Sequence, residues 1–383
     1  MQALCWYGKN DVRVETVADP KLLLPTDAIL RVTRTAICGS DLHLLHGAVP
    51  GMAAGDILGH EFTGEVVETG PEVKKLQRGD RVVVPFAISC GQCYACRHEL
   101  WALCDNSNPN AALSSRIYGD GVGALFGYSH PMGGYAGGQA QYVRVPYADV
   151  GPLKIPDGVS DEQALLLSDI FPTGYMAAEN CDLHPGNTVA IWGCGPVGQF
   201  AIRSALILGA ARVIAIDRIP ERLRMAAAGG AEPLHPNQVD DLQEELLWRT
   251  SGRGPDACID AVGLQPHGRR PGSSQGATVL HQAIAACRKG GTVSIPGVYE
   301  GDLNGVPFGT AFAKGLTFRM GPTHIHRYLR PLMQRIQQGE IDPAFVITHR
   351  CPLAQAPEAY RLFNHKQQDC IKVVLNPWPQ QAA

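Results

Sequence analysis

The sequence predicts an α/β protein with two domains, one a mostly antiparallel β domain and the other a doubly wound parallel sheet. At 383 residues, the chain is longer than most single domains. About the first 150 residues contain short β-like segments broken by glycine and proline, which is typical of antiparallel strands and turns. From about residue 160, strand-like runs alternate with helix-like runs, the pattern of a parallel sheet covered by helices.

The first domain is expected to be a compact, barrel-like unit. Its clearest strand candidates are residues 28–33, 62–68, 81–85 and 140–145. Each is short and lies near glycine or proline, so tight turns can return the chain to a neighbouring antiparallel strand.

The second half reads differently, because its apolar runs are continuous rather than alternating. Expected buried strands are residues 187–193, 212–217, 257–260 and 292–295, and expected helices occupy 161–168 and 328–338. A final strand is expected at 371–375. Strands that are apolar throughout indicate a sheet that is buried on both faces.

Residues 193–198 read GCGPVG and match the GxGxxG pattern of dinucleotide-binding turns. The first glycine permits the tight turn, the second lets the backbone approach a pyrophosphate, and the third lets helix and strand pack closely. The predicted binding residues are Gly193, Gly195, Pro196, Val197 and Gly198. The pattern alone is weak, but a β run precedes it and an apolar helix follows it. A glycine turn that binds nothing is the alternative.

Asp217 ends the next predicted strand, about 20 residues beyond the glycines, where this class of turn places an acidic residue. Its carboxylate would accept hydrogen bonds from ribose hydroxyls and repel a 2′-phosphate, which favours NAD over NADP. Arg218 follows directly and weakens this preference, because it can stack on adenine or meet a phosphate.

Four cysteines lie close together in CGQCYACRHELWALC, with the spacing C-x2-C-x2-C-x7-C. They are Cys90, Cys93, Cys96 and Cys104. Such gaps suit tetrahedral thiolate coordination of zinc, and four thiolates leave no open position for a substrate. Disulfides fit poorly because the loops would be very small, and an iron–sulfur cluster is a remote alternative. The loop is therefore predicted to hold a structural zinc and to take no part in catalysis.

The composition excludes several other classes of protein. The formal net charge of −3 gives no reason to expect a nucleic acid or an anionic membrane as partner. No basic segment followed by an apolar one opens the chain, and no apolar run reaches membrane-spanning length. We expect a soluble, cytoplasmic protein.

Three further residues are weak signals when each is taken alone: Cys38 in CGSDLH, His60 in GHE and Asp169 in SDIFPTGY. Together with the cysteine loop and the GCGPVG turn, however, these motifs resemble the zinc-dependent medium-chain alcohol dehydrogenases. The segments SDIFPTGY and GGYAGGQAQYVRVPYADVG look most like glutathione-independent formaldehyde dehydrogenases and formaldehyde dismutases.

The resemblance implies a GroES-like catalytic domain formed by residues 1–168 and 320–383, with a structural zinc lobe at 88–106. Residues 169–319 would form the Rossmann NAD-binding domain. Two zinc ions per chain are implied, one structural and one catalytic.

The resemblance also assigns roles to individual residues. Cys38, His60 and Asp169 would hold the catalytic zinc, with Glu61 beside them. Ser40 and His43 would relay the alcohol proton to solvent. Thr173 would pack against the nicotinamide, and Lys372 would contact the pyrophosphate.

The implied reaction is hydride transfer between NAD and a zinc-bound alkoxide, which interconverts a small alcohol and its aldehyde. Formaldehyde oxidation or dismutation is included, and a polyol or amino-alcohol substrate is the alternative within the family. A loop at 264–276 is similar in place to one that retains the cofactor in the formaldehyde group. The stretch 290–301 resembles the edge used in family dimers, so we expect a homodimer or homotetramer.

Overall fold

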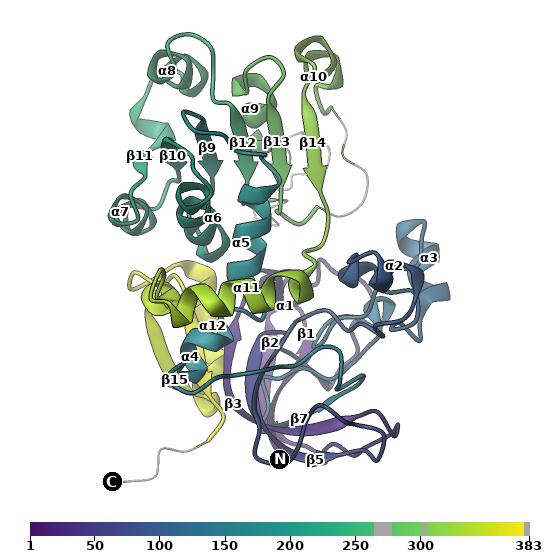
Figure 1. Cartoon of the computed structure of the whole chain (residues 1–383). Coiled ribbons are helices and arrows are strands. Elements are labelled where there is room, and N and C mark those ends of the chain that lie inside the picture. The colour runs from purple at the N-terminus through teal and green to yellow at the C-terminus, as the bar shows by residue number, and fades with distance from the viewer. Residues whose placement is uncertain (264–277, 300–302, 304, 379–383) are drawn as a thin grey trace. The chain divides into compact units, whose positions relative to one another are not determined.

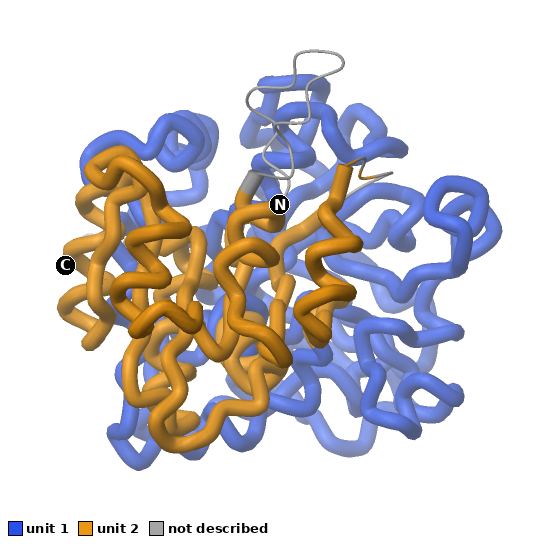
Figure 2. Tube along the Cα trace, turned by 90° about the horizontal axis from the view of Figure 1, so that it is seen from above, with its two compact units in different colours: residues 1–172, 324–383 blue, residues 173–323 orange. Residues whose placement is uncertain are grey.

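The computed structural model describes residues 1–263, 278–299, 303 and 305–378. The predicted loop at 264–276 lies outside these residues, as does part of the stretch at 290–301. The chain divides into two compact units, which Figure 2 distinguishes. Unit 1 comprises residues 1–172 and 324–383, and unit 2 comprises residues 173–323. The two domain boundaries predicted from the sequence, after residues 168 and 319, lie a few residues before the observed ones.

Unit 1 contains two sheets built almost entirely from antiparallel pairs (Figure 1). The smaller sheet has the order β2-β1-β4, and the larger has the order β15-β16-β3-β5-β6-β8 with β7 also paired to β3. The bounds are β1 Gln2–Gly8, β2 Asp11–Thr16, β3 Ala28–Ile37, β4 Asp56–Ile57, β5 Phe62–Thr69, β6 Arg81–Val84, β7 Tyr142–Val145, β8 Leu153–Lys154, β15 His349–Pro352 and β16 Val373–Asn376. The predicted mostly antiparallel unit is confirmed.

The C-terminal segment completes this sheet. β16 pairs antiparallel with β3, so that Val373 lies opposite Ile37, and parallel with β15. The helices of unit 1 are α1 Gly39–Leu45, α2 Tyr94–Arg97, α3 Ala111–Tyr118, α4 Asp161–Leu165, α11 Ile325–Gln337 and α12 Ala356–His365. α11 buries residues at helical spacing, from Ile325 through Leu329 to Ile336, which explains why this segment is helical.

Unit 2 is a six-stranded parallel sheet with the order β11-β10-β9-β12-β13-β14 (Figure 1). The strands are β9 Thr188–Trp192, β10 Arg212–Ile216, β11 Glu232–Leu234, β12 Ala257–Asp260, β13 Thr292–Ile295 and β14 Thr317–Met320. The helices are α6 Pro196–Ile207, α7 Pro220–Ala228, α8 Leu242–Arg249, α9 Thr278–Ala286 and α10 Phe308–Lys314. This is the doubly wound order predicted from the sequence. The chain adds strands on one side from β9 to β11 and on the other side from β12 to β14, so the switch point lies between β9 and β12.

Helix α5 (Ile170–Glu179) contains the point at which the chain passes from unit 1 to unit 2. The single helix predicted at 161–168 is shorter than expected, because α4 ends at Leu165. A turn then separates α4 from α5, and Asp169 is the last residue of that turn. The side chain of Asp169 therefore belongs to unit 1, whereas the predicted boundary had assigned this residue to the cofactor domain.

Candidate active site

The dispersed candidate ligands come together in unit 1. Cys38 stands at the start of α1, His60 and Glu61 precede β5, and Asp169 ends the turn before α5. One ligand atom from each of these side chains lies within 4.8 Å of every other, and all four residues are buried. The sequence had linked them only through resemblance, because 131 positions separate Cys38 from Asp169.

The spacing of these atoms fits a tetrahedral metal ion. Cys38 Sγ and His60 Nε2 each lie 3.3 Å from Asp169 Oδ2. Zinc bonds of about 2.0–2.3 Å at tetrahedral angles give ligand-to-ligand separations of roughly 3.3–3.7 Å. The donor set, one sulfur, one imidazole nitrogen and carboxylate oxygen, is also one that zinc accepts.

The electrostatics of the cluster favour a bound cation. Burial, together with the nearby Asp169 and Glu61, raises the pKa of the Cys38 thiol to about 11 against the opposing effect of His60. Burial alone would lower the pKa of His60, but Asp41 and Asp169 outweigh it and raise that pKa well above its ordinary value. Anionic groups packed this closely in a buried site are stabilised when a divalent cation lies between them.

Asp41 orients the His60 ring from the side opposite Asp169. Its Nδ1 atom lies 3.2 Å from Asp41 Oδ1, and both residues are buried. Nε2 therefore faces Asp169, and Ser40 Oγ lies 3.2 Å from it. A carboxylate on one imidazole nitrogen fixes the ring and its tautomer, which leaves the other nitrogen for a metal.

Glu61 is held by Lys372, and both side chains are completely buried. Lys372 Nζ donates to Glu61 Oε1 at 2.7 Å and to the Ile37 carbonyl at 3.0 Å. Burial alone would lower the pKa of Lys372, but Glu61 outweighs it and raises that pKa. The sequence predicted a pyrophosphate contact for Lys372. In the structure its ammonium group is engaged with Glu61 inside unit 1, a pairing that the sequence did not indicate.

The two other proposed reaction residues occupy different units. His43 is half-buried on α1, and burial together with the neighbouring His46 lowers its pKa. Thr173 is buried in unit 2, where α5 continues beyond the crossing. The structure thus brings Ser40 directly against His60 and places His43 on the same helix as Ser40.

Two aromatic rings beside the cluster were not predicted. Phe86 and Tyr128 approach His60 edge-on, with ring centroids 6.2 Å and 6.3 Å from the imidazole. Phe86 is half-buried and Tyr128 is buried. They give the candidate metal ligands apolar neighbours. No local sequence pattern around either residue predicts this position.

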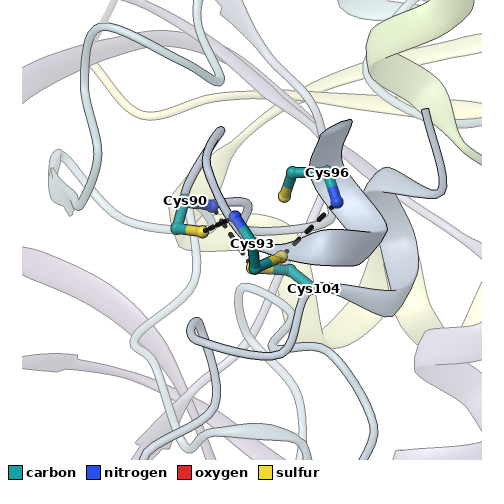
Figure 3. Close-up of side chains that lie close together, drawn as sticks. All are labelled: Cys90, Cys93, Cys96 and Cys104. Atoms are coloured by element: carbon teal, nitrogen blue, oxygen red, sulfur yellow. Dashed lines mark hydrogen bonds between the residues drawn. The ribbon is translucent and has the colours of Figure 1, made fainter. Parts of the chain in front are cut away.

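The cysteine loop forms the second cluster, shown in Figure 3. The Sγ atoms of all four cysteines lie within 4.8 Å of one another, and those of Cys93 and Cys104 are 3.8 Å apart. Four Zn–S bonds of about 2.3 Å at tetrahedral angles give sulfur-to-sulfur distances of roughly 3.8 Å. All four remain free thiols rather than disulfides, so the loop is suited to a structural zinc.

Backbone N–H groups surround these sulfur atoms. Cys93 N and Cys96 N donate to the preceding cysteines, Cys90 and Cys93, at 3.4 Å. Burial would raise the pKa of Cys90, but hydrogen bonds from the N–H groups of Gln92 and Cys93, and from the Cys104 and Cys93 side chains, bring it down to about 7. Such donors stabilise thiolates, the form that binds zinc.

The GCGPVG turn joins β9 to α6 in unit 2. Gly193 has a φ of 87°, and a Cβ atom on Gly198 would lie 1.8 Å from the Gly193 carbonyl oxygen. Gly195 is the N-cap of α6 and Pro196 its first residue, with Val197 next. The glycines therefore permit the close approach of helix and strand that the motif requires.

Asp217 lies at the end of β10 and supports this turn. Its Oδ2 accepts a hydrogen bond from Cys194 N at 2.7 Å, and its Oδ1 accepts one from Ile219 N at 2.9 Å. Arg218 is exposed. Arg222 was not singled out from the sequence. Its guanidinium lies 3.8 Å from Asp217 Oδ2, and a Cβ atom on Gly195 would lie 3.5 Å from it.

Comparison with known proteins agrees with this arrangement. Residues 24–157 match the alcohol dehydrogenase GroES-like domain, and residues 196–337 match the zinc-binding dehydrogenase domain. A GroES-like β domain with a Rossmann domain and these two cysteine-containing clusters defines a zinc-type oxidoreductase. Among the described residues, no helix is both long and apolar enough to cross a membrane.

Individual relatives define the family more closely. An uncharacterized zinc-type alcohol dehydrogenase-like protein AdhB of Bacillus subtilis is 40% identical over 98% of this chain and its own full length. The glutathione-independent formaldehyde dehydrogenase of the same organism is 36% identical over 98% of this chain and 97% of its own. The alcohol dehydrogenase TADH of Thermus sp. ATN1 has a TM-score of 0.85 and 37% identity, covering 98% and 99% of the two chains. The chain belongs to the zinc-type alcohol dehydrogenase family.

Proposed function

We propose that this protein is a zinc- and NAD-dependent oxidoreductase that interconverts a small alcohol and its aldehyde. The observation that carries the proposal is the buried cluster of Cys38, His60 and Asp169, with the Ser40 hydroxyl against His60. This combination supplies a mixed set of metal ligands with a proton-accepting group beside it, which a purely structural site does not need.

Cys38, His60 and Asp169 would hold the catalytic zinc, and Cys90, Cys93, Cys96 and Cys104 would hold the structural one. The catalytic zinc would supply Lewis acidity toward the oxygen of the substrate. Three protein ligands leave a coordination position for that oxygen, whereas four thiolates leave none. Glu61, tied to Lys372, adds a negative charge beside the ligands.

The chain's own residues would move the proton. Ser40 Oγ lies 3.2 Å from His60 Nε2 and would accept the hydroxyl proton of the alcohol. His43 follows on the same helix, α1, and its lowered pKa favours the neutral imidazole, which can take a proton and release it to solvent. Asp41 meanwhile holds the His60 ring in a fixed orientation.

Unit 2 would bind the cofactor at the carboxyl end of β9. The GCGPVG turn offers backbone N–H groups to the pyrophosphate, and Asp217 would face the adenosine ribose. Thr173 would contact the nicotinamide, as the family resemblance implies. The resemblance also implies a pyrophosphate contact for Lys372, but its buried ammonium group is engaged with Glu61, so we do not propose that contact. Nucleic acid is not proposed as a partner.

The substrate proposal centres on small alcohols and aldehydes, formaldehyde included, because a formaldehyde dehydrogenase is 36% identical to almost the whole chain. The test is a panel of methanol, ethanol, longer alcohols, formaldehyde and a polyol with NAD⁺, followed by NADH absorbance and product analysis. Equal yields of formate and methanol from formaldehyde without added NAD would indicate dismutation. Turnover of the polyol alone would favour the polyol dehydrogenase alternative, and no turnover of any substrate would contradict the proposal.

The choice of NAD over NADP is tested at Asp217. In the Asp217→Ala variant, Arg222 loses the nearby carboxylate and becomes free to meet a 2′-phosphate. We expect the NAD-to-NADP ratio of kcat/KM to fall by about tenfold or more, because the variant loses charged hydrogen bonds to the ribose worth about 1.5–3 kcal/mol each. The control is Glu221→Ala, which removes a neighbouring carboxylate that pairs with Arg224 instead. An unchanged ratio would remove Asp217 from the cofactor site.

We also propose a homodimer or homotetramer. β14 is the last strand of the parallel sheet, and Met320 within it is exposed, as are Phe308 and Phe312 on the preceding helix α10. A strand edge flanked by exposed apolar side chains is suited to pairing with a second copy. Light scattering should give at least twice the chain mass of 41.1 kDa, and a monomer at all concentrations would contradict the proposal.

A further inference from the structure

A buried row of polar side chains runs outward from His60 through unit 1. His60 Nδ1 lies 3.2 Å from Asp41 Oδ1, and Asp41 Oδ2 accepts a hydrogen bond from Gln139 Nε2 at 3.3 Å. Gln139 Oε1 in turn accepts one from the Tyr360 hydroxyl at 2.8 Å. The row ends on α12, more than two hundred residues after the segment in which it began.

Each member of the row is shielded from water. Asp41 and Gln139 are 0% exposed, Tyr360 is 1% exposed and His60 is 4% exposed. Among the described residues, neither His60 Nδ1 nor Asp41 Oδ1 makes a hydrogen bond of good geometry, and the 3.2 Å ionic contact between them joins the two groups. Buried polar groups without water depend on one another for their orientation.

Asp41 is fixed by contacts on its other oxygen. Its Oδ2 accepts hydrogen bonds from Cys38 N at 2.9 Å and from Gln139 Nε2. The first contact comes from the backbone of a metal-ligand candidate, and the second comes from a side chain. With Oδ2 held in this way, Oδ1 is directed toward the imidazole of His60.

Gln139 is itself clamped in place. Its backbone N donates to Leu58 O at 2.9 Å, its carbonyl accepts from Leu4 N at 2.8 Å, and Nε2 also donates to Ala36 O at 3.0 Å. Gly59 makes room for it, because a Cβ atom there would lie 2.4 Å from Gln139 Cγ. The other end of the Gln139 amide, Oε1, accepts the Tyr360 hydroxyl from α12.

We propose that Gln139 and Tyr360 are positioning residues for the metal site: they orient Asp41, and through Asp41 they hold His60 with Nε2 directed at the metal. This inference deepens the proposed function and rests on it, because it needs Cys38, His60 and Asp169 to bind a metal. The hydrogen bonds of the Gln139 and Tyr360 side chains go to Ala36, to Asp41 and to each other, so we place their effect on the ligands through Asp41.

The consequence is a metal affinity that depends on residues remote from the metal. Outer partners of metal-ligating histidines typically change metal affinity by about 10–100-fold when they are removed. Gln139→Met removes the amide that donates to Asp41, so we expect a loss in that range. Tyr360→Phe removes one hydrogen bond while keeping the ring, so we expect a loss of roughly fivefold.

The experiment compares wild type, Tyr360→Phe and Gln139→Met, with Tyr7→Phe as the matched control. Tyr7 belongs to the same unit and donates its hydroxyl to Glu15 at 2.5 Å, away from both clusters. Zinc affinity is measured by competition with a chelator that reports free zinc. Cobalt is then exchanged into each protein, and its visible absorption bands report the ligand field at the site. The Asp169→Ala variant supplies the spectrum of the cysteine loop alone.

We expect weaker zinc binding at one of two sites and shifted cobalt bands in both test variants, with neither change in Tyr7→Phe. Tyr360→Phe with wild-type affinity and wild-type cobalt bands would overturn the inference, and this holds whether or not Gln139→Met folds. A wild-type protein that binds only one zinc, lost when the cysteine loop is disrupted, would instead contradict the proposed function.

Discussion

The cysteine loop and the dispersed cluster both gather four buried side chains of ligand type within 4.8 Å, yet they are built in opposite ways. The loop takes four identical thiols from residues 90–104 and surrounds them with its own backbone N–H groups. The dispersed cluster takes different ligand types from separate segments and surrounds them with side chains such as Asp41, Lys372 and Ser40. A closed, local site suits structural support, whereas a mixed site with a neighbouring hydroxyl suits a reaction.

The proposed contrast between the two clusters is wrong if the cysteine loop does not support the fold. Cys96→Ser should remove metal from the loop and lower the free energy of unfolding by more than about 5 kcal/mol, because structural zinc contributes about 10–16 kcal/mol in small zinc peptides. Urea unfolding and metal analysis measure both effects. Cys5→Ser is the control, since Cys5 is equally buried but lies outside both clusters, and it should cost about 1–3 kcal/mol. Equal losses in the two variants would contradict a structural role for the loop.

The dispersed cluster should instead depend on charge pairing. Lys372→Met leaves Glu61 buried without its cation, which typically costs about 3–5 kcal/mol. Lys154→Met removes an exposed pair with Asp80 and should cost about 1 kcal/mol or less. Chemical denaturation compares the two variants. Unchanged stability together with weaker NAD binding would favour the pyrophosphate contact over the Glu61 pairing as the main role of Lys372.

A smaller change should separate catalysis from metal binding within the dispersed cluster. Ser40→Ala removes the hydroxyl beside His60 but no ligand, so we expect kcat to fall by about 10²–10⁴-fold while both zinc ions remain. Steady-state kinetics and metal analysis on one preparation give both values. Ser115→Ala, on the exposed face of α3, is the control with no expected effect. Full turnover in Ser40→Ala would remove this residue from the proton path.

The difference between the two clusters also explains what the sequence could predict. The cysteine loop was identified from spacing alone, because all of its ligands lie within one short segment. Cys38, His60 and Asp169 could be joined only by resemblance to a family, since single residues so far apart form no local pattern. The pairing of Glu61 with Lys372 spans 311 positions and was not predicted.

The fold shows the same division between local and remote information. Continuous apolar runs predicted β9, β10, β12 and β13 closely, because strands buried on both faces carry a strong signal. β14 was missed, because three of its four residues are exposed and its composition resembles a loop. The break between α4 and α5 was missed as well, although it places Asp169 among the candidate metal ligands.

The most direct test of two clusters with separate tasks is the zinc content of Asp169→Ala beside that of wild type, after dialysis against a weak chelator. Wild type should contain about two zinc ions per chain and the variant about one. The variant should also retain most of its stability and lose more than about a hundredfold in turnover. Retention of both metals with full turnover, or loss of both metals together, would contradict separate tasks for the two clusters.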